Sequence, residues 1–217
     1  MTECDYHTAT ISQELPPGQK LSYQSFPMKS QPNITGLILA GGAGRRVGLR
    51  DKGLILWRGK PLIAHVCDRL KPQIGELLIS CNRNFFQYQE FAARTVADNR
   101  RGFQGPLAGL EAASAYIRSE LLVVVSCDMP HLPPDLVMRL VSPLAPGSTD
   151  SPEICYAHDG IRAQYLCAVI KRDCLSTLSN FLDGGHRAVR NWYQSHHSIA
   201  VDFSDRRLSF RNYNKFD

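Results

Sequence analysis

The chain has 217 residues, of which 43% are hydrophobic, 21% charged and 9% aromatic. This composition excludes a wholly disordered chain, a fibre and a coiled coil, and no apolar run approaches the ~20 residues that a membrane helix needs. The formal net charge of +5 suits an anionic small ligand, but without a long basic block it does not indicate nucleic-acid binding. Seven scattered cysteines without a C-x-x-C pair, and an N-terminus unlike a secretory signal, predict a cytoplasmic protein with reduced thiols.

The first 32 residues differ from the rest of the chain. They hold several prolines and many Ser, Thr and Gln, and they show no sustained periodicity. Such a segment cannot bury enough apolar surface to offset the entropy of ordering, so we predict a flexible tail at 1–32. Residues 33–217 are predicted to form a single domain.

The domain alternates between short apolar runs and helical patterns. In chain order, the pattern predicts a strand at 35–40, a helix at 61–71, a strand at 77–80, a short helix at 85–93, a strand at 95–97, a helix at 106–119, a strand at 121–126 and a helix at 134–141. Strands at 154–158 and 163–171, helices at 173–182 and 187–195, and a strand at 199–203 follow. Strands buried on both faces predict a three-layer α/β/α fold with a mostly parallel, mixed sheet of Rossmann-like character.

A glycine-rich stretch, L-A-G-G-A-G-R-R-V-G-L-R-D-K-G, runs from residue 39 to residue 53. It starts at the carboxyl end of the first strand, where open α/β sheets bind their ligands. Glycines let backbone N–H groups approach phosphate oxygens, and Arg46 and Lys52 can offset the phosphate charge. The stretch is neither a G-x-G-x-x-G loop, because Val47 holds the third glycine position, nor a P-loop, because Leu49 follows Gly48.

This stretch resembles the L-A-G-G-x-x-x-R-[MV]-G-x-x-K signature of nucleotidyltransferases with the GT-A-type, nucleotide-diphospho-sugar-transferase-like fold. With D-K-G at 51–53 and G-K-P-L at 59–62, it is most similar to the MobA-type family, the molybdenum cofactor guanylyltransferases. The resemblance spans about residues 34–214. It implies a catalytic role for Arg46 and Lys52. It also implies nucleotide contacts from Leu39, Ala40, Gly41, Gly42, Gly44 and Lys52.

An aspartate, Asp128, comes directly after the strand at 121–126, within C-D-M-P. Its carboxylate would face the same sheet edge as the glycine-rich stretch. There it can bind Mg²⁺ together with substrate phosphates, or it can cap the following turn. The family's C-D-x-P motif carries the metal-binding aspartate, so the resemblance implies that Asp128 is catalytic and coordinates Mg²⁺ and the nucleotide phosphates.

Further polar and glycine residues match the family's nucleotide-binding motifs. Ser80 and Asn82 lie in S-C-N-R, where the family has N-x-N-R and its first Asn contacts the nucleotide. The resemblance also places a nucleotide-binding carboxylate at Asp98, which can accept hydrogen bonds from guanine N1 and N2 or from ribose hydroxyls. Gly105 and Gly109 belong to G-P-L-A-G, which in the family marks guanine-specific members together with A-G-G in the first loop.

Three residues are candidates for binding the second substrate. Asn212 and Asn214 lie in F-R-N-Y-N, which resembles the family's F-x-N-x-N near the C-terminus. Arg187 follows a glycine turn and is a second-phosphate candidate or an ordinary surface arginine.

The resemblance implies Mg²⁺-dependent transfer of GMP from GTP to the terminal phosphate of molybdopterin in the molybdenum cofactor. The products would be the guanine dinucleotide form and pyrophosphate. Other cofactor-assembly proteins and acceptor molybdoenzymes are the partners that the family implies, with neither nucleic acid nor membrane. Two alternatives stay open: a cytidylyl- or sugar-1-phosphate-specific nucleotidyltransferase of the same fold, and a non-catalytic nucleotide-binding homologue.

Overall fold

The computed structural model describes residues 34–42, 50–144 and 151–213, and the predicted tail at 1–32 lies outside them. Seven strands form one sheet in the order β5-β4-β1-β6-β8-β7-β9. The strands are β1 (Ile34–Leu39), β4 (Glu76–Ser80), β5 (Arg94–Val96), β6 (Leu121–Ser126), β7 (Ile154–His158), β8 (Ala163–Lys171) and β9 (Ser198–Asp202). β5, β4, β1 and β6 run parallel, whereas β8 runs antiparallel to both β6 and β7.

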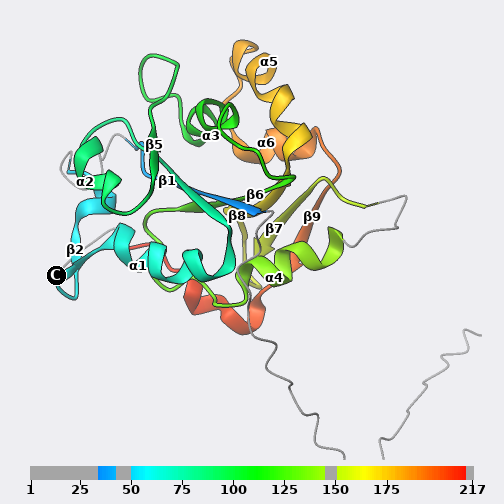
Figure 1. The fold of residues 1–217 in the computed structure, drawn as a ribbon. Helices are drawn as coiled ribbons and strands as arrows, with labels where there is room; N and C mark the ends of the chain where they lie inside the picture. The colour runs from blue at the N-terminus through cyan, green and yellow to red at the C-terminus, as the bar shows by residue number, and fades with distance from the viewer. Residues whose placement is uncertain (1–33, 43–49, 145–150, 214–217) are drawn as a thin grey trace, which may run out of the picture.

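Helices cover both faces of this sheet (Figure 1). One face carries α1 (Leu62–Leu70), α2 (Phe85–Gln89) and α4 (Leu136–Val141), and the other carries α3 (Pro106–Ser114), α5 (Leu178–Asp183) and α6 (Val189–Gln194). Each face buries its own apolar cluster, because residues of β1 and β6 alternate between the two. The predicted three-layer α/β/α architecture with a mostly parallel, mixed sheet is therefore confirmed.

The strands at 121–126, 154–158 and 163–171 have the predicted bounds, and the other predicted strands shift by one residue or so. Two helices differ from their predicted form. The helix predicted at 106–119 ends at Ser114, where 3₁₀-type bonds from Tyr116 to Ala113 and from Ile117 to Ser114 close the last turns. The helix predicted at 173–182 begins as 3₁₀ helix η5 (Arg172–Thr177) before α5. The remaining 3₁₀ segments are η2 (Lys52–Leu54), η3 (Lys71–Gln73), η4 (Ser142–Leu144) and η6 (Ser204–Phe210).

A short hairpin before α1 was not predicted. It pairs β2 (Leu56–Trp57) with β3 (Lys60–Pro61). Its two central residues have positive φ, 50° at Arg58 and 76° at Gly59, as a two-residue type I′ turn requires. Arg–Gly is not the usual Asn–Gly or Asp–Gly signal, so the sequence pattern missed it.

Within the described ranges, no helix is both long enough and apolar enough to cross a membrane. The six described cysteines all carry unpaired thiols, and all are buried.

Candidate functional site

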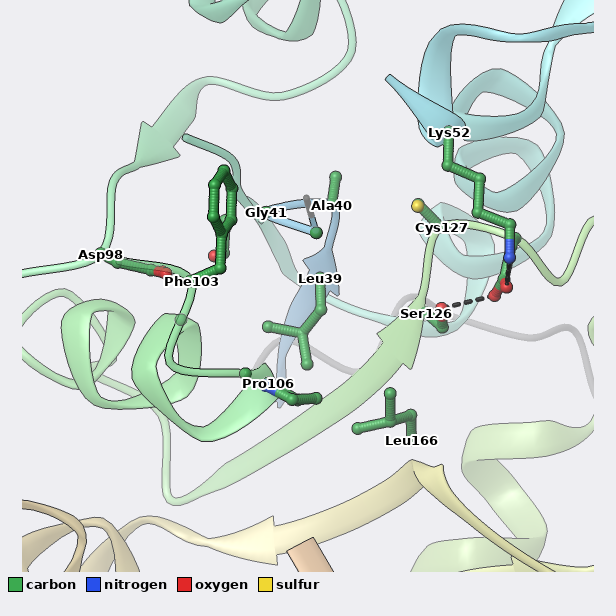
Figure 2. A pocket seen from close by; sticks show the side chains of 15 residues that line it. Leu39, Ala40, Gly41, Lys52, Asp98, Phe103, Pro106, Ser126, Cys127 and Leu166 are labelled. Atoms are coloured by element: carbon green, nitrogen blue, oxygen red, sulfur yellow. Dashed lines mark hydrogen bonds and ion pairs between the residues drawn. The ribbon is translucent and has the colours of Figure 1, made fainter. Parts of the chain in front are cut away.

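A cleft of ≈ 480 Å³ opens at the carboxyl edge of the parallel strands. The last residue of β1, Leu39, pairs with Ser80 of β4 on one side and with Ser126 of β6 on the other, so three strand ends meet there. This is where open α/β sheets bind ligands, and the volume suits a small molecule. The cleft is lined by Leu39, Ala40, Gly41, Gly42, Lys52, Ser80, Asp98, Phe103, Gly105, Pro106, Gly109, Ser126, Cys127, Asp128 and Leu166 (Figure 2).

Ten residues that the sequence predicted as nucleotide-binding line this cleft. They are Leu39, Ala40, Gly41, Gly42, Lys52, Ser80, Asp98, Gly105, Gly109 and Asp128. Three further candidates, Asn82, Asn212 and Arg187, are described but are not part of its lining. Gly44, Arg46 and Asn214 lie outside the described residues, so their predicted roles stay predictions.

An ion pair closes one end of the cleft. Lys52 Nζ donates to Asp128 Oδ2, and the hydroxyl of Ser126 donates to Oδ1 of the same carboxylate. Asp128 is only 5% exposed, and it lies two residues beyond the end of β6. The sequence prediction that the loop lysine and the strand-end aspartate share one site agrees with this contact.

A buried carboxylate one residue earlier fixes the position of Lys52. Asp51 is 8% exposed and accepts hydrogen bonds from Tyr88 Oη at 2.5 Å and from Asn84 Nδ2 at 3.0 Å. The guanidinium of Arg83 lies 3.5 Å from the same carboxylate. Because its neighbour is held by α2 and the β4–α2 loop, Lys52 is directed toward Asp128.

Asn82 joins the glycine-rich stretch to the opposite wall of the cleft. Its Nδ2 donates to the carbonyl of Gly41 at 3.1 Å and to Asp98 Oδ2 at 2.8 Å. Its Oδ1 accepts from the backbone N–H of Asp98 at 2.9 Å. Asn82 therefore positions two cleft residues without lining the cleft itself.

The Asp98 carboxylate is the least satisfied polar group in the cleft. Its Oδ1 is buried and has no hydrogen-bond partner within the described part of the chain. Burial raises the pKa of the Asp98 carboxyl above its usual range, against the effect of the Asn82 hydrogen bond, and nearby Glu111 raises it further. A buried, unpartnered acceptor is costly, so it indicates a ligand that donates hydrogen bonds there.

An aromatic residue that the sequence analysis missed stands beside Asp98. Phe103 is 55% exposed yet lines the cleft, and Figure 2 shows its ring beside Asp98, across the cleft from Lys52. A large apolar side chain within a glycine-containing loop was the available signal. An exposed ring at a cleft wall offers a stacking surface for a flat base.

Two arginines hold this aromatic loop in place. Arg187 Nε donates to Gln104 Oε1 at 2.7 Å, and its Nη1 donates to the carbonyl of Leu182 at 2.7 Å. Arg100 pairs with Glu111 through two bonds of 2.7 Å and with Asp183. Arg187 was predicted either as a phosphate-binding or as a surface residue, and in the structure its guanidinium donates hydrogen bonds to other residues of the chain.

Two glycines, one just before α3 and one within it, allow close approach at the cleft. Gly105 has a φ of 88°, a left-handed conformation that disfavours other residues, and Pro106 then begins the helix. At Gly109 a Cβ would lie 2.4 Å from Ser80 Oγ and 3.1 Å from a methyl group of Leu39. The helix therefore packs against the strand ends only because this position has no side chain.

We expect Gly109→Ala to destabilise the fold by about 1–3 kcal/mol, the usual cost of an overpacked core. Thermal and urea unfolding would measure the loss. Ser80→Ala removes the closest atom, so the Gly109→Ala/Ser80→Ala double variant should regain part of the stability. Equal stability of the single and double variants would contradict this contact.

The thiol in the cleft is not suited to act as a nucleophile. Burial raises the pKa of Cys127 well above its usual range, and the adjacent Asp128 carboxylate adds to the effect. The thiol therefore stays protonated at neutral pH, whereas the thiolate is the reactive form. The lining favours binding and charge neutralisation over covalent catalysis.

Comparisons with known proteins show the family of the chain. A family model described as the MobA-like NTP transferase domain matches residues 36–199. A molybdenum cofactor guanylyltransferase from Shewanella loihica is 40% identical over 183 residues, covering 84% of this chain and 92% of that protein. A second molybdenum cofactor guanylyltransferase, from Shewanella baltica, is 41% identical over 187 residues, covering 86% of this chain and 93% of that protein.

Solved structures share the fold at lower identity. The molybdopterin-guanine dinucleotide biosynthesis protein A from Archaeoglobus fulgidus superimposes with a TM-score of 0.66 at 21% identity, over 83% of this chain and 92% of that one. A nucleotidyl transferase from Methanothermobacter gives a TM-score of 0.61 at 19% identity, over 83% and 91%. The matched model covers the cleft from β1 to β9, and on this basis the chain belongs to the MobA-like NTP transferase family.

Proposed function

We propose that this chain transfers GMP from GTP to the terminal phosphate of molybdopterin in the molybdenum cofactor, releasing pyrophosphate. The observation that carries the proposal is a glycine-lined cleft with the Lys52–Asp128 pair at one end and the unpartnered oxygen of Asp98 at the other. This arrangement matches a molecule with charged phosphates at one end and hydrogen-bond donors at the other. The guanylyltransferase name of relatives at about 40% identity supports the same substrates.

The guanine base is assigned to the Asp98 side of the cleft. Guanine presents two adjacent donors, N1–H and the 2-amino group, and a carboxylate accepts from both. The Phe103 ring offers a face for the base, and Gly105 places no side chain against it. The triphosphate then extends along Gly41 and Gly42 toward Lys52.

The residues at the other end fit a hard divalent cation such as Mg²⁺. Mg²⁺ is usually held by one or two carboxylates, waters and substrate phosphates, and the nearly buried Asp128 carboxylate supplies such a ligand. When bound, the ion would neutralise charge on the phosphate oxygens. Without nucleotide, the ammonium of Lys52 balances Asp128, and we expect it to turn toward the phosphates when they bind.

The chain needs little acid–base chemistry for this transfer. A phosphate monoester is largely ionised near neutral pH, since its second pKa is about 6, so the acceptor phosphate is already a nucleophile. Lys52 would neutralise the leaving pyrophosphate, and Gly41 and Gly42 would hold the triphosphate for in-line attack at the α-phosphorus. Catalysis then rests on positioning and charge neutralisation.

The second substrate is placed on the Asp128 side, away from Asp98. The backbone N–H of Tyr213 donates to the backbone carbonyl of Asp128 at 3.0 Å, so the exposed Asn212 is one residue from a backbone contact with Asp128. Trp57, His131 and Tyr213 form an aromatic cluster there, with Trp57 4.9 Å from His131 and 5.0 Å from Tyr213 between ring centres. Asn212 and this cluster are our candidates for contacting the pterin.

We further propose a cytoplasmic location and contact with other cofactor-assembly proteins and acceptor molybdoenzymes.

Nucleotide preference tests the proposed donor. With Mg²⁺ present, we expect GTP to raise the melting temperature more than CTP, ATP or UTP, because guanine alone among these bases presents two adjacent donor nitrogens, N1 and the 2-amino group, to Asp98. A thermal-shift series at equal nucleotide concentrations measures this. Preferential stabilisation by CTP would instead assign the chain to the cytidylyl-transferring alternative.

A further inference from the structure

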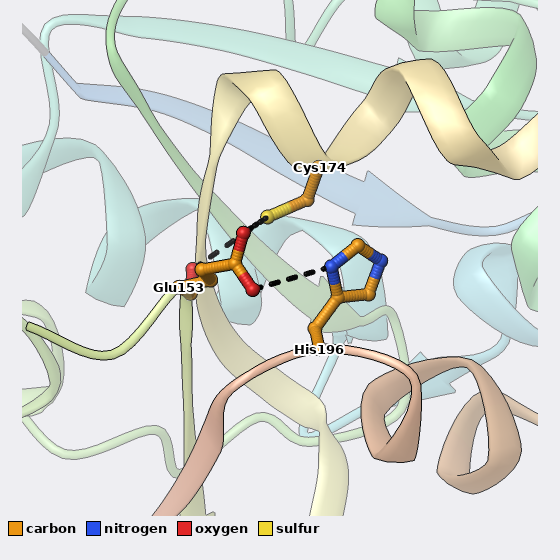
Figure 3. Close-up of side chains that lie close together, drawn as sticks. All are labelled: Glu153, Cys174 and His196. Carbon is orange, nitrogen blue, oxygen red and sulfur yellow. Dashed lines mark hydrogen bonds and ion pairs between the residues drawn. The ribbon is translucent and has the colours of Figure 1, made fainter. Parts of the chain in front are cut away.

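Three side chains with metal-ligating atoms lie together on the edge of the sheet opposite the cleft. Glu153 precedes β7, Cys174 lies in η5 and His196 follows α6 (Figure 3). One ligand atom from each lies within 4.8 Å of the other two. Because Leu121 pairs with Lys171 and Ile154 with Ile170, this cluster lies near the amino end of β6, whereas the cleft lies at its carboxyl end.

The hydrogen bonds of Thr177 determine which nitrogen of His196 carries a proton. The Thr177 hydroxyl donates its single proton to the carbonyl of Cys174 at 2.8 Å and accepts from Trp192 Nε1 at 2.9 Å. Its remaining contact, 3.1 Å to His196 Nε2, therefore has the imidazole as donor. A ligating histidine is commonly oriented in this way, by a hydrogen bond from its other nitrogen.

This tautomer leaves His196 Nδ1 facing a carboxylate. Nδ1 lies 3.5 Å from Glu153 Oε2, and a neutral imidazole would present a lone pair to that oxygen. Oε2 also accepts a hydrogen bond from the backbone N–H of His197 at 3.0 Å. Oε2 and Nδ1 face one another favourably only with a proton or a metal cation between them. The Cys174 sulfur lies 4.0 Å from Glu153 Oε1 and adds a third atom that can bind a metal ion. The histidine side chain is 7% exposed and the glutamate side chain 45% exposed, so the cluster is open to solvent on the Glu153 side.

We propose that Glu153, Cys174 and His196 bind one Zn²⁺ ion, with water as the fourth ligand. A set of one carboxylate, one thiolate and one imidazole suits zinc, which takes O, S and N ligands in tetrahedral geometry. Around such an ion the donor atoms are about 3.3–3.6 Å apart, so the observed separations of up to 4.8 Å must shorten by at most about 1.5 Å. Rotation about the side-chain bonds of Glu153 and Cys174 would provide this movement. Binding releases the thiol proton to solvent and leaves a Zn–thiolate bond.

The ion would link three segments that are distant in the sequence. Glu153 is held to the start of β9 through its backbone N–H, which donates to His197 O at 2.8 Å, and to β8 through its carbonyl, which accepts from Lys171 N at 2.9 Å. Zn²⁺ would add η5 and the α6–β9 turn to this connection. The expected role is stabilisation of this end of the sheet, independent of nucleotide transfer.

Cobalt and zinc titrations of the full chain test the proposal. After removal of bound metal with a chelator, Co²⁺ should produce thiolate-to-cobalt charge-transfer absorption in the near ultraviolet at one ion per chain. Zn²⁺ should abolish the absorption by displacing cobalt. At about 100 times its dissociation constant, Zn²⁺ should raise the melting temperature by about 5–10 °C.

Matched cysteine variants separate this site from the cleft. Cys174→Ser should lose both the absorption and the zinc-dependent thermal shift, whereas Cys127→Ser, which alters the cleft thiol beside Asp128, should keep both. Cys155→Ser, a buried thiol outside the cluster, should also keep them. Should Cys174→Ser fold poorly, Glu153→Gln retains the shape of the side chain and should weaken cobalt binding.

Two outcomes would overturn the proposal. One is an absence of thiolate absorption in the unmodified chain, which would mean that a second proton on His196 balances Glu153. The other is a cobalt absorption that survives in Cys174→Ser, or a cobalt affinity that is unchanged in Glu153→Gln. Neither outcome depends on GTP, so failure here would leave the proposed guanylyl transfer untouched.

Discussion

Replacing Asp128 with alanine is expected to lower guanylyl transfer by at least about 10²–10³-fold, the usual cost of removing one group that stabilises transition-state charge. The carboxylate is the proposed anchor for Mg²⁺, and its removal also deletes the ion pair with Lys52. Pyrophosphate release from GTP and molybdenum cofactor, measured at saturating Mg²⁺, gives the rate. Asp128→Asn keeps the shape but loses the charge, so it should be nearly as impaired.

A surface carboxylate provides the matched control. Asp205 pairs with Arg139 away from the cleft, and Asp205→Ala should transfer GMP at the unmodified rate. Thermal unfolding of both variants separates loss of chemistry from loss of fold. Full activity of a folded Asp128→Ala protein would refute the assigned role of this carboxylate.

The sequence predicted the sheet well where hydrophobic pattern alone decides the structure. The apolar side chains of L-L-V-V-V-S at 121–126 are all removed from water only in a strand buried on both faces, and β6 has those bounds. The hairpin at Arg58 and Gly59 was missed because an arginine with positive φ has no sequence signal. The split of 173–182 into η5 and α5 likewise depends on packing that periodicity does not record.

The sequence predicted the cleft residues at the strand ends better than the residues that hold them in position. Lys52 and Asp128 stand in recognisable motifs, whereas the function of Asp51 as their anchor depends on Tyr88 and Asn84, which only the fold brings to it. Arg187 illustrates the converse. Its position after a glycine turn suggested a phosphate ligand, but the folded chain supplies Gln104 and backbone carbonyls as its partners. Charge alone in a sequence does not distinguish a ligand contact from an internal tether.

Asp98→Asn is expected to convert the preference of the cleft from GTP toward XTP. Charge-assisted hydrogen bonds contribute about 1.5–3 kcal/mol, so losing them should weaken GTP binding about 10–100-fold. Xanthine has a carbonyl where guanine has its 2-amino group, and the amide of an asparagine can donate to it. Asn82 can still donate to the oxygen of the new side chain, as it now does to Asp98 Oδ2. Titration calorimetry with GTP and XTP measures both affinities.

The pH dependence of GTP binding provides a second measure on the same pair of proteins. Because burial raises the pKa of Asp98, the carboxylate begins to protonate at a higher pH than an exposed aspartate would. The protonated form cannot accept from both guanine donors, so acidification through this raised pKa should weaken GTP binding. The triphosphate itself also titrates, and subtracting the profile of Asp98→Asn removes that contribution.

If Asp98 instead binds the ribose, the Asp98→Asn variant will lose affinity for GTP, XTP and ATP by the same factor. In that case the carboxylate would hold the nucleotide without selecting its base, and guanine selectivity would have to come from the Phe103 loop and the start of α3.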